Sequence, residues 1–178
     1  GLVGSEMCIR DRSNVAQHTS GRNTGVVHTP FYLNPEKKKI FAKSAQSSHE
    51  LWKTLAKNTM SPWNEIGTIE VALNETQHKT LEKYQKWGIE NGVLEENLVL
   101  LDSNEIKQKE KNVECFSGLL CKSDVSTDYS KLTQEIKKIS AQNSTEFLFQ
   151  KSVKSFIKND DTIQVNLTDN SSIECSYL

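Results

Sequence analysis

The sequence has no long apolar run, almost no net charge and few cysteines. No stretch approaches the roughly 20 apolar residues that a membrane-spanning helix needs. The 22 Lys and Arg residues nearly balance the 23 Asp and Glu residues, so charge favours neither nucleic acid nor an anionic membrane as a partner. The four cysteines form no CxxC pair and have no histidines at metal-ligand spacing. We therefore expect reduced thiols, no metal site and a cytoplasmic protein.

A turn of glycines and small polar residues occupies positions 17–29, with the sequence QHTSGRNTGVVHT. Glycine has no Cβ to collide with a ligand, and hydroxyl and amide side chains supply hydrogen bonds. The same residue types also make ordinary surface turns. On composition alone, the turn is either a loop that lies against a polar ligand or a plain surface loop.

The segment SGRNTGVVHT, followed by Tyr32, Pro35 and Lys39, resembles the flavin-facing segment of FAD-dependent oxidoreductases of the amino-acid-oxidase type. The most similar branch is L-2-hydroxyglutarate oxidase/dehydrogenase, where the pattern is S-G-x-N-S-G-V-I-H-x-G with a tyrosine, a proline and a lysine at similar spacings. The resemblance continues through GTIEVAL at 67–73, Gly118 and the tail. It covers nearly all of the chain after residue 13.

The resemblance implies that the chain binds FAD and oxidises a small substrate with a hydroxyl or amine next to a carboxylate, with hydride passing to the flavin. Main-chain groups of Val153 are expected to hold the adenine. The residues expected to line the flavin are Ser20, Gly21, Arg22, Asn23, Thr24 and Gly25.

His28 is the candidate catalytic residue, because imidazole titrates near neutral pH. It would act as a base that takes the hydroxyl proton or as a cation that holds the carboxylate. A histidine that only packs and hydrogen-bonds beneath the flavin is the alternative. Tyr32 is expected to contact the substrate.

The favoured substrate is a small 2-hydroxy acid similar to 2-hydroxyglutarate. Pro30 stands where the family shows glycine, and it fixes its own φ and restricts Thr29. Glycerol 3-phosphate or a small amino acid therefore remains an alternative substrate. A non-catalytic α+β binding domain is the second alternative, and the electron acceptor stays open.

The apolar periodicity predicts an α+β fold. Helices are expected from Pro35 to the Ser61-Pro62 pair, over 76–91, from an N-cap at Ser103 through 109, and from Asp128 onward. The first helix should place Phe41, Ala45, Trp52 and Leu55 on one apolar face, and the last should do so with Tyr129, Leu132, Ile136 and Ile139. Strands are expected over 68–73, 98–101 and 116–122. Alternating apolar residues over 151–178 predict a three-stranded antiparallel meander.

The resemblance also assigns domains: residues 13–58 and 128–178 to an FAD domain, and 59–127 to a substrate domain. Residues 1–12, GLVGSEMCIRDR, fit neither a signal peptide nor the family pattern and look like a translated sequencing adapter. The family's G-x-G-x-x-G turn and the acidic residue after it do not occur in the 178 residues. We therefore expect an internal fragment of a longer enzyme, inactive on its own.

Overall fold

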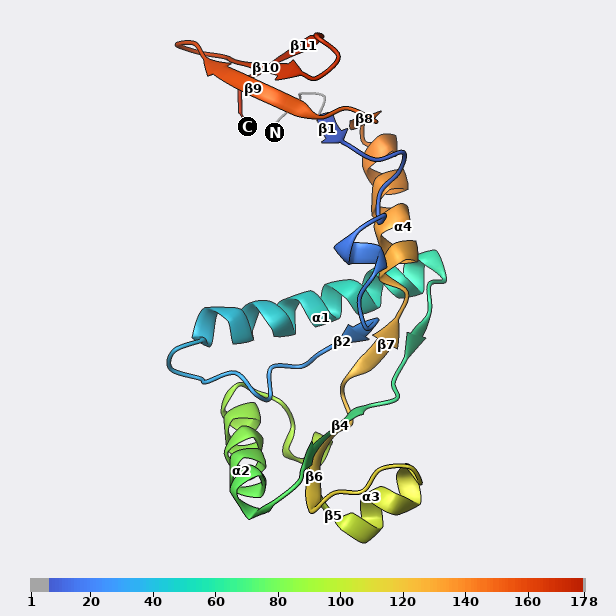
Figure 1. Ribbon diagram of the computed structural model, residues 1–178, viewed down its shortest axis with the longest axis vertical. Helices are drawn as coiled ribbons and strands as arrows, with labels where there is room; N and C mark the ends of the chain where they lie inside the picture. The colour runs from blue at the N-terminus through green and yellow to red at the C-terminus, as the bar shows by residue number, and fades with distance from the viewer. Residues whose placement is uncertain (1–6, 178) are drawn as a thin grey trace. The chain divides into compact units, whose positions relative to one another are not determined.

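The computed structural model describes residues 7–177, which form helices and small sheets of the α+β class (Figure 1). This class confirms the prediction. The chain divides into two compact units: a terminal unit, made of the chain up to Asn23 and from Tyr129 onward, and a central unit, Thr24–Asp128. Residues 24–58, which the resemblance assigns to the FAD domain, belong to the central unit by their contacts. The functional assignment of the domains stays a prediction.

The terminal unit contains the meander expected from the alternating tail. Strands β9 (Val153–Lys158), β10 (Ile163–Leu167) and β11 (Ser172–Cys175) pair antiparallel in the order β9-β10-β11. Val165 and Leu167 of the middle strand are buried. The prediction of a three-stranded meander is therefore confirmed.

The terminal unit also contains a parallel strand pair, a short 3-10 turn and one helix. Strand β1 (Met7–Arg10) pairs with β8 (Glu146–Phe149), so part of the expected adapter segment takes a place in the fold; residues 1–6 lie outside the described residues. The turn is η1 (Thr19–Gly21). Helix α4 (Tyr129–Gln142) buries Leu132, but Ile136 and Ile139 on the predicted face are 40% and 42% exposed.

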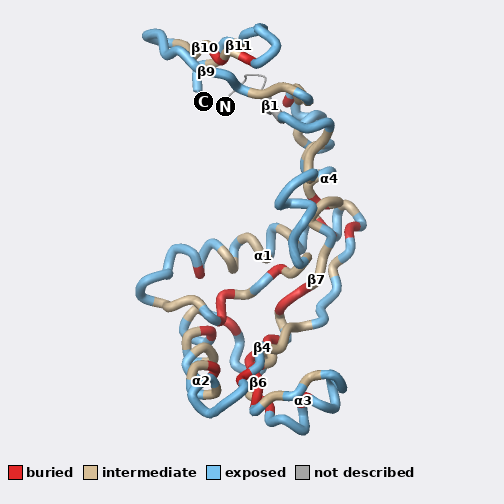
Figure 2. Tube along the Cα trace, viewed as in Figure 1, coloured by how far each residue is buried: buried red, intermediate tan, exposed pale blue. Residues whose placement is uncertain are grey.

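The central unit is built on a three-stranded antiparallel sheet in the order β4-β6-β5. These strands are β4 (Thr68–Ala72), β5 (Leu98–Asp102) and β6 (Ser117–Cys121). Helix α2 (Glu75–Glu90) packs on one face of this sheet (Figure 1). Leu81, Leu119 and Cys121 belong to the core between them. Figure 2 shows buried segments of the chain around β4 and β6. Helix α3 (Ser103–Lys109) lies on the other face of the sheet. Its Ile106 lies next to Gly118 of β6. Gly118 points away from α2, because residues alternate along a strand and the next residue, Leu119, faces α2.

A second small sheet has the order β2-β7-β3 and is antiparallel throughout. Its strands are β2 (Val26–Val27), β3 (Trp63–Asn64) and β7 (Val125–Thr127). Val27 lies opposite Val125, so the next residues outward, His28 and Asp124, face each other. This register brings together two residues that are 96 positions apart.

The helix ends differ from the sequence prediction at two places. Helix α1 (Lys39–Thr59) begins four residues after the predicted start at Pro35. A turn precedes it, in which Asn34 Oδ1 accepts hydrogen bonds from the backbone N–H groups of Glu36 and Lys37. The N-cap of α3 is Asp102 rather than Ser103, and Asp102 forms a capping box with Glu105.

The predicted apolar face of α1 is only partly correct. Phe41 is 62% exposed, while Ala42 and Ala56 are the buried positions. None of the helices within residues 7–177 is long and apolar enough to span a membrane.

Gly88 gives a test of how closely α2 approaches the chain after His28. A Cβ on Gly88 would lie 2.5 Å from Cδ1 of Leu98 and 2.9 Å from Cβ of Phe31. Alanine normally favours a helix by about 1 kcal/mol over glycine, but overpacking costs typically about 1–3 kcal/mol. We expect Gly88→Ala to lower the free energy of unfolding by about 1 kcal/mol in urea titrations, whereas exposed Lys86→Ala leaves it unchanged. A stabilised Gly88→Ala variant would contradict this packing.

Candidate functional site

Asp124 is a fully buried carboxylate at the start of β7. Its Oδ1 accepts hydrogen bonds from the backbone N–H of Thr29 at 2.7 Å and from the Thr29 hydroxyl at 2.8 Å. Its Oδ2 accepts one from the Thr68 hydroxyl at 2.7 Å and lies 2.7 Å from Nδ1 of His28. The thiol of Cys121 donates to Oδ1 at 3.4 Å. A buried charge is stable only when it is paired and hydrogen-bonded in this way.

The hydrogen bonds shift both partners toward their charged forms. Burial alone would raise the pKa of Asp124, but the bonds from His28, Thr29 and Thr68 outweigh it and lower that pKa below its ordinary 3.8. The hydrogen bond to Asp124 raises the pKa of His28 above 6.5; burial partly opposes it, and the charges of Asp124 and Glu70 add to it. Each shift has a cause in the geometry.

The two shifts define the pH window in which the pair stabilises the fold. The Asp124 contribution is present above 3.8 and is lost as pH falls through the lowered pKa. The His28 contribution is complete below 6.5 and is lost as pH rises through the raised pKa. The pair is therefore most stabilising at mildly acidic pH.

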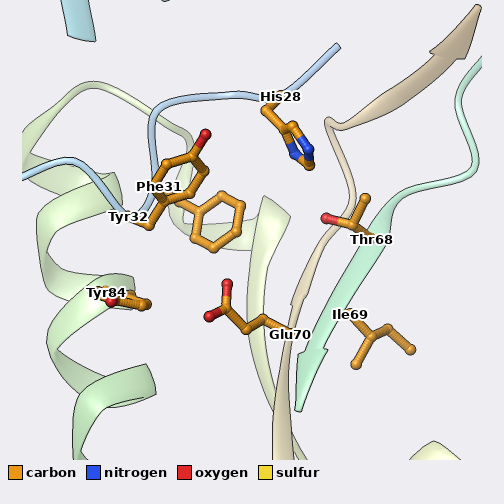
Figure 3. Close-up of a pocket in the computed structure, with 7 residues that line it drawn as sticks. All are labelled: His28, Phe31, Tyr32, Thr68, Ile69, Glu70 and Tyr84. Carbon is orange, nitrogen blue, oxygen red and sulfur yellow. The ribbon is translucent and has the colours of Figure 1, made fainter. Parts of the chain in front are cut away.

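His28 lies at a pocket of about 390 Å³ in the central unit, between the chain after β2, strand β4 and helix α2 (Figure 3). Its side chain is 42% exposed, although Nδ1 is bound to Asp124. The other polar side chains of the lining are Tyr32, Thr68, Glu70 and Tyr84. Thr68 and Glu70 share a face of β4, because strand residues alternate. A pocket of this size suits a small substrate.

Tyr32 lies beside His28 in the lining of the pocket, and its contact with a substrate stays a prediction. The two rings meet edge to face with centroids 6.1 Å apart, and Phe31 contacts Tyr32 in the same way at 5.0 Å. Burial raises the pKa of the Tyr32 phenol, and the charges of Asp124 and Glu70 raise it further. Tyr32 is therefore a neutral hydrogen-bond donor at neutral pH.

The glycine-rich turn runs from one unit into the other between Asn23 and Thr24. A Cβ on Gly21 would lie 1.9 Å from the carbonyl oxygen of Ala16. Gly25 has φ of +72°, and its Cβ would lie 2.8 Å from the carbonyl oxygen of Thr127. Close approach of the chain to itself thus explains both glycines without a ligand.

Of the predicted cofactor-binding residues, Thr24 and Gly25 belong to the central unit, and the others lie in the terminal unit. The Asn23 amide donates to the carbonyls of Thr19 and Ser20 at 3.0 and 3.1 Å, so it closes its own turn. Gly21 and Arg22 line a second pocket, of about 510 Å³, with Gln17, His18 and Arg12. Ser20 is exposed, and Val153, the first residue of β9, is 47% exposed.

The second pocket fits an anionic cofactor such as FAD by the chemistry of its donors. Guanidinium groups and amides bind phosphate and carbonyl oxygens. Arg12 belongs to the segment that we expect to be non-native, and its Nε donates to Nε2 of His18 at 2.9 Å. The fit therefore depends on Arg22 and Gln17.

Sequence reasoning proposed His28 and Tyr32 as site residues, which stays a prediction, and named neither Asp124 nor Glu70 beside them. No motif marks Asp124, and the strand that follows it has only three residues. Thr68 and Glu70 lie within the segment GTIEVAL that carries part of the family resemblance. That segment was the one available signal for them.

Comparisons with known proteins agree with the resemblance. The family described as FAD dependent oxidoreductase matches residues 3–177. Glycerol 3-phosphate oxidase of Mycoplasma pneumoniae is 35% identical over 108 residues, which are 59% of this chain and 28% of that protein. Mitochondrial L-2-hydroxyglutarate dehydrogenase of Mus musculus is 29% identical over 104 residues, 57% of this chain and 21% of that protein. This chain thus matches less than a third of either relative.

Solved structures show the same fold. Dithionite-reduced L-alpha-glycerophosphate oxidase of Mycoplasma pneumoniae with FAD bound aligns at a TM-score of 0.80 and 25% identity, covering 92% of this chain and 43% of that chain. Glycine oxidase of Geobacillus kaustophilus aligns at 0.82 and 12% identity, covering 96% of this chain and 46% of that one. Since the family match extends over nearly the whole sequence, the chain belongs to the FAD-dependent oxidoreductase family.

Proposed function

We propose that the protein carrying this chain oxidises a small 2-hydroxy acid, with His28 as the base that takes the hydroxyl proton. The observation that carries this proposal is the half-exposed imidazole at the pocket, with Nδ1 bound to buried Asp124. That contact leaves Nε2 for the substrate. FAD, the cofactor of the family, would accept the hydride from the substrate carbon.

The residues of the chain divide the remaining work. Arg22 and the main chain at 20–25 and Val153 would hold FAD. His28 would take the hydroxyl proton through Nε2, and the negative charge of Asp124 would stabilise the imidazolium that forms. The neutral phenol of Tyr32 would donate a hydrogen bond to a substrate oxygen.

Glu70 favours a second candidate substrate. Neither Lys nor Arg is among the residues that line the 390 Å³ pocket, and Glu70 adds a carboxylate to it. The second carboxylate of a hydroxy diacid would be repelled there. A hydroxyl or an ammonium group would instead donate a hydrogen bond to Glu70. A small amino acid, whose ammonium group would bind Glu70, is therefore the second candidate, whereas the phosphate of glycerol 3-phosphate would be repelled like the second carboxylate.

His28→Asn tests the catalytic role. General base catalysis contributes typically 10²- to 10⁴-fold, so flavin reduction by substrate should slow by about that factor in the longer, FAD-loaded protein that carries this chain, with FAD affinity little changed. Stopped-flow absorbance of the flavin gives the rate. The control is His49→Asn, since His49 lies in the same unit and its Nε2 contacts the Ser123 carbonyl. Equal losses of rate and of FAD affinity would make His28 a structural residue.

The pH profile distinguishes a base from a cation. The hydrogen bond to Asp124 raises the pKa of His28 above 6.5. A base works when neutral, so the rate of flavin reduction should increase as pH rises through this pKa. A cation that holds the carboxylate would give the opposite slope. Single-turnover rates between pH 5.5 and about 9 measure the profile.

Glu70→Gln separates the two substrate classes. Removing the negative charge should raise kcat/KM for 2-hydroxyglutarate by about tenfold if a diacid occupies the pocket. If an amino acid is the substrate, kcat/KM for it should fall, because an acceptor with a full charge is lost. Steady-state assays with each substrate measure the ratio, and exposed Glu90→Gln on α2 is the matched control.

A further inference from the structure

We propose that Asp124 is the positioning residue of this site: its carboxylate holds the His28 imidazole as the Nδ1-protonated tautomer and turns Nε2 toward the pocket. The catalytic consequence rests on the proposed function of His28. The tautomer itself follows from the contacts of the central unit. Asp124 is not among the residues that line the 390 Å³ pocket, so it would act through His28.

The first step is the location of the proton. An ionised carboxylate only accepts hydrogen bonds, and Oδ2 of Asp124 lies 2.7 Å from Nδ1 of His28. A contact of this length needs a proton on Nδ1. In the neutral imidazole, Nε2 is then the acceptor, which is the nitrogen a base needs.

The second step is the rigidity of the carboxylate. Besides His28, four donors bind the Asp124 carboxylate: the amide and hydroxyl of Thr29 and the thiol of Cys121 on Oδ1, and the hydroxyl of Thr68 on Oδ2. Rotation of the carboxylate would leave these buried groups without partners. Thr29 follows His28 directly, so one carboxylate fixes both the backbone and the ring at this point.

The third step concerns the other groups that face the ring. Glu70 from β4 and Tyr32 from the chain after β2 also lie near the imidazole. Glu70 acts on His28 through its charge alone, whereas Asp124 acts first through a hydrogen bond. Among the described residues, Asp124 is therefore the group that can select one ring nitrogen.

Nitrogen NMR of histidine-labelled protein tests the tautomer without any activity assay. The wild-type protein should show neutral His28 protonated at Nδ1, and a proton on Nε2 would overturn the proposal whether or not any variant folds. Asp124→Asn should lower the His28 pKa by about 1 unit, since an opposite charge close by shifts a pKa by roughly 1–3 units. Unchanged tautomer and pKa in a folded variant would also overturn it.

Kinetics of the longer, FAD-loaded protein that carries this chain give the second readout. Asp124→Asn should reduce kcat on the order of 100-fold with little change in KM, and should move the acidic limb of the pH profile to lower pH. Asp102→Asn, at the N-cap of α3, is the matched control because asparagine also caps helices. Thr68→Val removes one donor but keeps the pair, so it should retain the Nδ1 tautomer.

The outcomes separate the two proposals. If the tautomer depends on Asp124 but substrate reduces the flavin of the His28→Asn variant at the normal rate, the base function is wrong and the positioning role stands. If flavin reduction is slow in the His28→Asn variant while the folded Asp124→Asn variant keeps both kcat and the tautomer of His28, the positioning role is wrong and the base function stands.

Discussion

The buried charge of Asp124 is the constraint on which the central unit depends. A carboxylate without contact to water must receive its hydrogen bonds from the protein. Here the donors come from the chain after β2, from β4 and from the end of β6. These three segments are far apart in sequence, so the carboxylate couples their folding. Loss of one donor leaves a buried charge incompletely paired, and the cluster therefore behaves as a unit.

The register of the strands brings the side chains of the candidate site together around Asp124. The antiparallel pairing of β2 with β7 sets His28 opposite Asp124, and the pairing of β4 with β6 sets Thr68 opposite Cys121. Because side chains alternate along a strand, Glu70 shares the face of Thr68 and reaches the pocket. A slip of one residue in β4 would turn both side chains to the α3 face of the sheet.

The sequence predicted the longer helices and strands and singled out His28 and Tyr32, the exposed residues of the candidate site. Helix α2 and the meander were found because apolar periods extend over many residues there, and His28 was found through the resemblance of its segment to a known family. Strands β2, β3 and β7 have two or three residues each, too few for any period. The contact of Asp124 with His28 depends on the pairing of those strands, so no sequence pattern indicated it. Phe41 fitted the helical period but is exposed, because apolar spacing alone does not define which face is covered.

Two carboxylates in opposite surroundings act on one imidazole. Asp124 is buried, saturated with donors and bound to the ring, whereas Glu70 is exposed at the pocket and acts through space. Both favour a positive charge on His28, so a proton that reaches Nε2 is stabilised by two carboxylates. The same negative field weakens binding of any second anionic group near Glu70. The two carboxylates that favour a proton on His28 therefore also disfavour an anionic group in the pocket beside Glu70.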